Sequence, residues 1–159
     1  MRISSLLAAT AAASTASAAV MRIAASSISW KWTVTGWSAG CAEQCHYDFN
    51  VTAVGNSTGK PATPSFKAYC SGEGEGAGYQ VCKTLEESET DYRVAAQLLP
   101  SNSTGSARRA QIQVSLQYTD LQTPSTWWNY TGKAEALYNE YAAPFMNFTI
   151  TPDTVYGVA

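Results

Sequence analysis

The sequence lacks an excess of positive charge, since ten Lys and Arg stand against twelve Asp and Glu, for a net charge of −2. Removal of Arg2 with a cleaved leader makes this 9 − 12 = −3. We therefore expect neither nucleic acid nor an anionic membrane as a partner. Beyond the N-terminus the chain also lacks the run of roughly 18 apolar residues that a membrane span requires. It shows no convincing amphipathic helix pattern either, so the prediction turns on strands and cysteines.

The N-terminal segment has the form of a secretory signal peptide. Met1-Arg2 is followed by an apolar, Ala-rich run over residues 3–13 and by Ala16-Ser17-Ala18. A positive end, an apolar segment and a small-x-small site are the three parts of such a signal. The alternative, an uncleaved membrane anchor, conflicts with the Ser and Thr content. We expect a signal peptide over residues 1–18, a flexible leader over 19–27 and one β-domain over 28–159.

Five Asn-x-Ser/Thr sequons support an extracellular location independently of the leader. A glycan must point to solvent, so each acceptor should lie on an outward face. Asn50 alternates with Phe49 and Val51, which fits that requirement, and we expect one or two of the sites to remain unused. The candidate acceptors are Asn50, Asn56, Asn102, Asn129 and Asn147.

Period-two alternation of apolar and polar residues recurs along the chain. It is clearest over residues 110–118, where Ile112, Val114, Leu116 and Tyr118 alternate with polar residues. Such alternation is typical of antiparallel strands with one solvated face. Further strands are expected over residues 28–37, 47–54, 93–99, 147–151 and 154–158, with weaker signals over 127–131 and 133–141. Short strands with turn signals between them predict an all-β fold, a compact antiparallel β-barrel or sandwich.

The four cysteines, Cys41, Cys45, Cys70 and Cys82, all lie in one window and predict two disulfides. Two short strands on either side of a Gly-rich loop place Cys70 before the loop and Cys82 after it, as a hairpin tied by a disulfide. Our first choice is therefore Cys70 with Cys82 and Cys41 with Cys45. The crossed pairing, Cys41 with Cys82 and Cys45 with Cys70, stays open, because four cysteines allow three connectivities.

Several residue groups suggest chemistry, and each has a simpler interpretation. Cys45-His46 would offer a thiol and a base, but neighbours on a strand point to opposite faces. Gly72-Glu73-Gly74-Glu75-Gly76 superficially resembles a phosphate loop, yet no helix follows and its carboxylates would repel phosphate. Glu86, Glu87, Glu89 and Asp91 could offer oxygen ligands to calcium, but they lack a recognised loop spacing, which favours a solvated acidic turn. No acid among the twelve is singled out for glycoside hydrolysis. We expect no catalytic residue, no metal and no cofactor, and predict that the protein is not an enzyme.

Aromatic residues give the strongest indication of recognition, since the chain has five Trp and nine Tyr. Aromatic side chains anchor interfaces and stack on planar or sugar ligands. Trp30 and Trp32 are expected in the core. Trp127 and Trp128 are adjacent, so on a strand one of them must face outward. We name Trp127 and Trp128 as possible partner-binding residues.

Short motifs spread over most of the chain resemble the Alternaria major-allergen-like family of small secreted fungal proteins. They are Trp32-x-Val34-x-x-Trp37, Gly40-Cys41-x3-Cys45-x-Tyr47-x-Phe49, Phe66-x-Ala68-x-Cys70, Tyr79-x-x-Cys82, the strand from Gln111 to Tyr118, Phe148-x-Ile150 and Tyr156-Gly157-Val158. The resemblance implies a twisted β-barrel or sandwich, a Cys70–Cys82 disulfide and no established enzyme activity. It also implies a host defence protein or a small phenolic ligand as partner. The chain departs from the family in lacking a further cysteine pair near its C-terminus.

Together these features predict a secreted fungal binding protein of effector, elicitor or allergen type, acting in the extracellular space through protein or small-ligand recognition. The alternatives are a structural protein of the fungal cell wall or surface and, less favoured, a small hydrolase of wall polymers. No oligomeric state is assigned.

Overall fold

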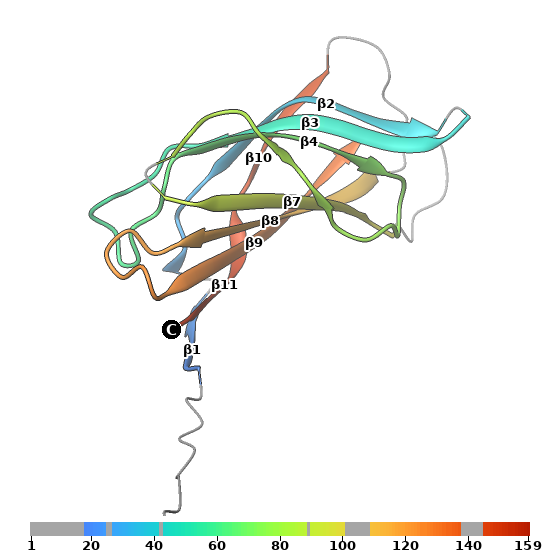
Figure 1. Cartoon of the computed structure of the whole chain (residues 1–159). Coiled ribbons are helices and arrows are strands. Elements are labelled where there is room, and N and C mark those ends of the chain that lie inside the picture. Colours follow the sequence, from blue (N-terminus) through green and yellow to red (C-terminus); the bar gives the residue numbers. More distant parts are fainter. Residues whose placement is uncertain (1–17, 25–26, 42, 89, 101–108, 138–144) are drawn as a thin grey trace, which may run out of the picture.

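The computed structural model describes residues 18–24, 27–41, 43–88, 90–100, 109–137 and 145–159. They form eleven strands in two antiparallel sheets (Figure 1). The six-stranded sheet has the order β1-β11-β9-β8-β7-β5 and the five-stranded sheet the order β10-β2-β3-β4-β6. The strands are β1 (Val20–Ile23), β2 (Trp32–Cys41), β3 (Cys45–Ala53), β4 (Phe66–Glu73), β5 (Gln80–Val81), β6 (Lys83–Thr84), β7 (Tyr92–Leu99), β8 (Arg109–Thr119), β9 (Trp127–Leu137), β10 (Met146–Ile150) and β11 (Pro152–Val158). The all-β prediction is confirmed in its sandwich form.

The alternating pattern of β8 sets the character of the six-stranded sheet. Ile112, Val114, Leu116 and Tyr118 are at most 1% exposed, whereas the polar residues between them lie on the outer face. β8 pairs along its length with β7 on one side and β9 on the other. The inner face therefore needs a second sheet to cover it, and the five-stranded sheet does so.

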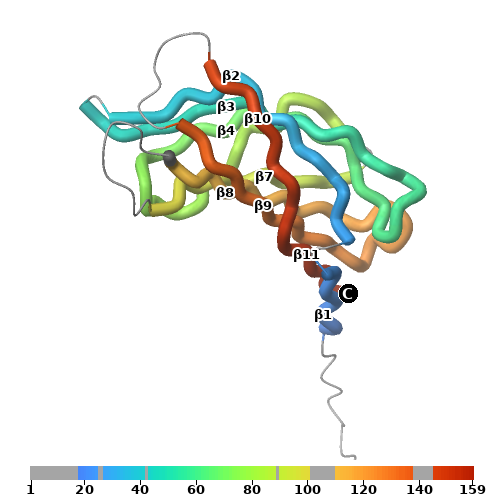
Figure 2. Tube along the Cα trace, turned by 180° about the vertical axis from the view of Figure 1, so that it is seen from behind, coloured from blue at the N-terminus to red at the C-terminus, as the bar shows by residue number. Residues whose placement is uncertain are grey.

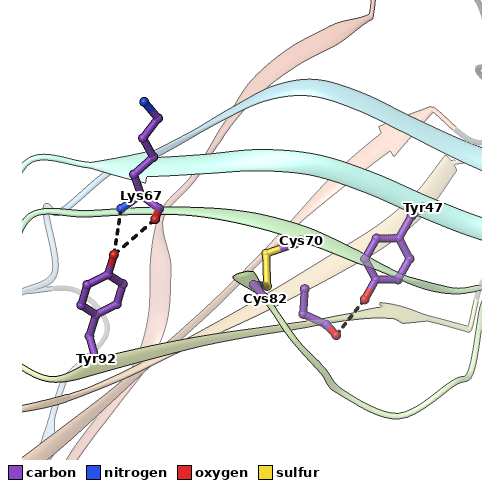
Figure 3. Close-up of a disulfide and its surroundings, with 6 residues drawn as sticks. Tyr47, Lys67, Cys70, Cys82 and Tyr92 are labelled. Carbon is purple, nitrogen blue, oxygen red and sulfur yellow. Dashed lines mark hydrogen bonds between the residues drawn. A yellow bond between two sulfur atoms is a disulfide. The ribbon is translucent and has the colours of Figure 1, made fainter. Parts of the chain in front are cut away.

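Aromatic rings fill the space between the sheets. Trp32, Trp37, Tyr47 and Phe49 come from β2 and β3 and are almost fully buried. The Tyr47 hydroxyl donates a hydrogen bond of 2.8 Å to the carbonyl oxygen of Ala96 in β7, which joins the two sheets through the core (Figure 3). Burial raises the pKa of Tyr47 to about 12, so its hydroxyl remains a donor at neutral pH.

The two disulfides join Cys41 with Cys45 and Cys70 with Cys82, which confirms our first choice and excludes the crossed pairing. The hairpin expected around Cys70 and Cys82 is confirmed only for a short part, because its second strand is divided between the two sheets. β5 pairs with β7 in the six-stranded sheet, and β6, directly after Cys82, pairs with β4. Cys82 lies where the chain crosses from one sheet to the other, so its bond to Cys70 in β4 links the two layers (Figure 3).

The N-terminal part of the described chain also differs from expectation. A flexible leader was predicted over residues 19–27, but Val20–Ile23 form β1, which pairs with β11 beside the C-terminus (Figure 2). Trp30 was expected inside a strand, but β2 begins at Trp32. Residues 1–17 of the predicted signal peptide lie outside the described residues. Within the described ranges, no helix is long and apolar enough to cross a membrane.

Candidate recognition surface on the six-stranded sheet

The five tryptophans differ in how their indole N–H groups are used. Trp30, Trp37 and Trp128 donate hydrogen bonds of 2.7 Å to the Val54 carbonyl, the Leu137 carbonyl and the Asp120 carboxylate. The N–H of Trp32 is buried without a partner in the described structure. Trp127 is only half-buried and no hydrogen bond to its N–H is found among the described residues. Trp127 is therefore the tryptophan that offers both a ring and a donor to a second molecule.

Trp127 and Trp128 begin β9 and point to opposite faces of the sheet, as predicted. Trp128 faces inward and is 8% exposed. Gly157 in β11 lets it pack closely, because a Cβ at that position would lie 2.8 Å from the Trp128 ring. A larger residue at position 157 would push this ring out of place. Trp128 is thus part of the structural core, and only Trp127 remains as a partner-binding candidate.

Asp120, in the turn before β9, holds Trp128 from the other side. Its carboxylate accepts hydrogen bonds of 2.7 Å from the backbone N–H groups of Gln122 and Thr123 as well as from the Trp128 indole. Burial raises the pKa of Asp120, but these three hydrogen bonds outweigh it, and the resulting pKa lies below the ordinary value. The charged turn therefore fixes the start of β9, where Trp127 emerges.

Trp127 rests on Tyr156 of the neighbouring strand β11. The two rings meet edge to face, with centroids 5.7 Å apart and planes inclined at 74°. Such pairs are favourable beyond the area that they bury, so the Trp127 ring is held in one orientation before any partner arrives. Burial raises the pKa of Tyr79, the Tyr156 hydroxyl raises it further, and a hydrogen bond with Gln97 lowers it in part.

A groove of about 420 Å³ runs beside Trp127 and is lined by Asp91, Arg93 and Gln117 among others. Arg93 and Gln117 are direct neighbours across β7 and β8. We call the set Trp127, Tyr156, Asp91, Arg93 and Gln117 the Trp127 patch. It combines an aromatic face, a guanidinium, a carboxylate and an amide, the groups by which proteins recognise peptides and sugar hydroxyls.

The sequence pointed to Trp127 but missed the rest of the patch. Tyr156 lies 29 residues further along and comes to Trp127 only because β11 pairs with β9. Arg93 and Gln117 are adjacent only through the β7–β8 register. Strand pairing of this kind leaves no mark in local sequence patterns, so only the period-two signals of the separate strands were available.

The structure also places the residues that were considered for catalysis and metal binding. Cys45 is bonded to Cys41, so it presents no free thiolate as a nucleophile or a zinc ligand. His46 is exposed at the same hairpin. Among the described residues, no group of three or more His, Cys, Asp or Glu side chains is arranged to hold a metal ion.

The sequon asparagines differ in the exposure and the hydrogen bonds of their side-chain amides. Asn129 is half-buried, and its Nδ2 donates to Ser115 Oγ at 2.9 Å while its Oδ1 accepts from Thr131 Oγ1 at 3.0 Å. Asn56 and Asn147 are exposed, and each accepts a hydrogen bond from a backbone N–H through its Oδ1. Asn50 is half-buried on the outer face of β3. Asn102 lies outside the described residues.

The fold and this surface define an antiparallel β-sandwich with two disulfides and a half-buried Trp127 that packs edge to face against Tyr156. Comparisons with family models, with curated proteins and with solved structures gave no match.

Proposed function

We propose that the chain is a secreted fungal binding protein, of the effector or elicitor type, that recognises a host extracellular protein through the Trp127 patch. The observation that carries the proposal is the contrast between Trp127 and the other tryptophans, of which Trp30 is also half-buried but has its N–H bonded to the Val54 carbonyl. The Trp127 ring is half-exposed and fixed on Tyr156, whereas its N–H has no partner among the described residues. An ordered, half-exposed tryptophan is the residue type most enriched at binding hot spots.

Three further features support an extracellular binding role. Two disulfides in a small chain fit an oxidising compartment. The signal-peptide pattern and the exposed sequon residues Asn56 and Asn147 agree with secretion. The motif resemblance to Alternaria major-allergen-like proteins supports the same extracellular binding role, and we include membership of that family in the proposal.

The direct test is affinity capture from plant extracellular fluid with the secreted protein and the variant Trp127→Ala. The control is Ser71→Ala, an exposed change on β4 in the other sheet. We expect one host protein to be retained by wild type and by the control, and at least tenfold less by Trp127→Ala. Equal retention by all three, or none by wild type, would reject the proposal.

A second candidate, binding to a wall polymer, is favoured by the amides on the same face. Gln97 donates to Gln113 at 2.7 Å, and Asn129 and Gln117 extend the polar surface toward Tyr156. Amides beside aromatic rings suit sugar hydroxyls and sugar C–H faces. Co-sedimentation with purified chitin and β-glucan separates the candidates. Pelleting that Trp127→Ala abolishes would favour the wall-polymer function over a protein partner.

A further inference from the structure

A second groove, which shares no lining residue with the groove at Trp127, lies beside Trp30. Its volume is about 540 Å³, within the usual range for small-ligand sites. It is bounded by the segment before β2, the end of β3, the loop after β3 and Tyr130 of β9. The groove therefore lies where parts of both sheets meet.

One part of the wall of this groove is aromatic and closely packed. Trp30 meets Trp32, Phe66 and Tyr130 edge to face, with centroid distances of 5.3–5.9 Å, and its N–H is fixed on the Val54 carbonyl. Since that donor is already used, Trp30 presents hydrocarbon to the groove. A wall that does not rearrange binds a ligand at little entropic cost.

Apolar side chains extend this wall into solvent. Val54 is 83% exposed, and Ile23, Ile28 and Pro61 also line the groove. Val54 is the most exposed large hydrophobic residue in the described structure. Exposed apolar surface gathered beside a groove is typical of a binding site rather than of a free surface.

The charges at the groove have one sign. Lys31 and Lys60 line it and are both exposed, and its lining contains neither Asp nor Glu. The one ion pair found among the described residues, Lys67 with Glu86, lies elsewhere. The two ammonium groups are therefore available for an anion, although the whole chain carries a net charge of −2.

We propose that this groove binds an amphipathic carboxylate, with its hydrocarbon body against Trp30, Val54 and Ile28 and its anionic head between Lys31 and Lys60. The apolar side chains at Trp30, Val54 and Ile28 favour a ligand with a hydrocarbon body over a simple inorganic anion, and the two cations disfavour an amphiphile with a positive head. The site shares no residue with the Trp127 patch, so either proposal can fail without the other.

The test is titration of the secreted protein with decanoate, followed by tryptophan fluorescence and calorimetry after enzymatic removal of N-glycans, because the sequon residue Asn56 also lines the groove. Butyrate supplies the head without the body, and decyltrimethylammonium supplies the body with the opposite charge. We expect saturable binding of decanoate that is at least tenfold tighter than that of either analogue.

Substitutions inside and outside the groove test whether decanoate binds there. Lys31→Glu with Lys60→Glu should weaken decanoate binding at least tenfold. The matched control, Lys83→Glu with Lys133→Glu, changes the same number of exposed charges away from the groove and should stay within twofold of wild type. Val54→Ser should weaken decanoate binding and leave butyrate unchanged. Absence of saturable decanoate binding, equal binding of decyltrimethylammonium, or equal loss in the two charge variants would overturn the proposal.

Discussion

The outer faces of the two sheets offer different surfaces to a second molecule. On the five-stranded sheet, two sequon residues approach each other around Gly36, whose N–H donates to Asn147 Oδ1 and whose Cβ position lies 3.9 Å from Asn50 Nδ2. On the six-stranded sheet, Trp127 lies fixed on Tyr156 beside Arg93 and Gln117. We infer that the first face is suited to carry glycans and the second to bind a partner.

The same contrast exists within one strand. Trp127 and Trp128 are neighbours in β9, yet the first faces solvent and the second fills the core beside Gly157. Successive side chains of a strand point to opposite faces, which places one tryptophan in the core and the other on the surface.

The largest expected effect is on stability and separates these two tryptophans. Trp128→Ala removes a buried ring and its hydrogen bond to Asp120, and should lower the free energy of unfolding by about 3–5 kcal/mol. Trp127→Ala loses mainly its contact with Tyr156, and should cost about 1 kcal/mol. Urea unfolding of both variants measures the difference. Similar losses would show that Trp127 is a structural residue.

The next effect concerns the Cys70–Cys82 disulfide, which lies where the chain crosses between the two sheets. Replacing Cys70 and Cys82 by Ala should cost about 3 kcal/mol or more, because the bond closes the longer loop and both residues are buried. Replacing Cys41 and Cys45 by Ala should cost about 2 kcal/mol or less, since that bond closes a short, exposed turn. Thermal unfolding of the two double variants gives the order, and the reverse order would contradict this account of the sandwich.

A smaller effect depends on pH and on Asp120. Because the pKa of Asp120 is lowered on folding, its contribution is complete above the unfolded pKa of about 3.9 and is lost as the pH falls through the folded value. The stability advantage of wild type over Asp120→Asn should therefore be constant from about pH 5 to 7 and shrink below about pH 4. Asp48 has the opposite tendency, because burial raises its pKa despite His46. If the difference in free energy of unfolding between wild type and Asp120→Asn stayed constant down to pH 2.5, the ionised Asp120 carboxylate would not be the cause of that difference.

The smallest effect is on modification and needs no substitution. Asn56 and Asn147 are exposed, whereas Asn129 is half-buried and its amide is bonded to Ser115 and Thr131 in the middle of the six-stranded sheet. We expect glycopeptide mapping of the secreted protein to show high occupancy at Asn56 and Asn147 and low occupancy at Asn129. High occupancy at Asn129 would cover the strand position two residues from Trp127 and would weigh against a bare binding face.

Much of the fold could be predicted from local patterns. The alternation in β8 located a central strand, and the even cysteine count with its spacing favoured the observed disulfides over the crossed ones. The predictions that failed depended on which distant strands pair with one another. Val20–Ile23 has no strong strand signal of its own and is ordered by pairing with β11. The residues around Cys82 resemble the second half of a hairpin, but the chain there crosses between the sheets.

The candidate site was predicted only in part for the same reason. Adjacent tryptophans on a strand imply one outward ring, which is a local argument. The identity of that ring depends on which face the second sheet covers. Its support by Tyr156 and its polar neighbours Arg93 and Gln117 depend on three strand registers. Local sequence patterns specify none of these registers, because the pairing of distant strands is decided by packing of the whole sheet.

Hydroxyl-radical footprinting of the tryptophans, with and without plant extracellular fluid, tests the central claim most directly. The account predicts that Trp127 is oxidised faster than Trp128, Trp32 and Trp37 in the free protein, and that the fluid protects Trp127 at least fivefold. Protection should disappear after the fluid is depleted with immobilised wild-type protein and persist after depletion with Trp127→Ala. A Trp127 as unreactive as Trp128 in the free protein, or equally reactive with and without the fluid, would contradict the assignment of this surface to recognition.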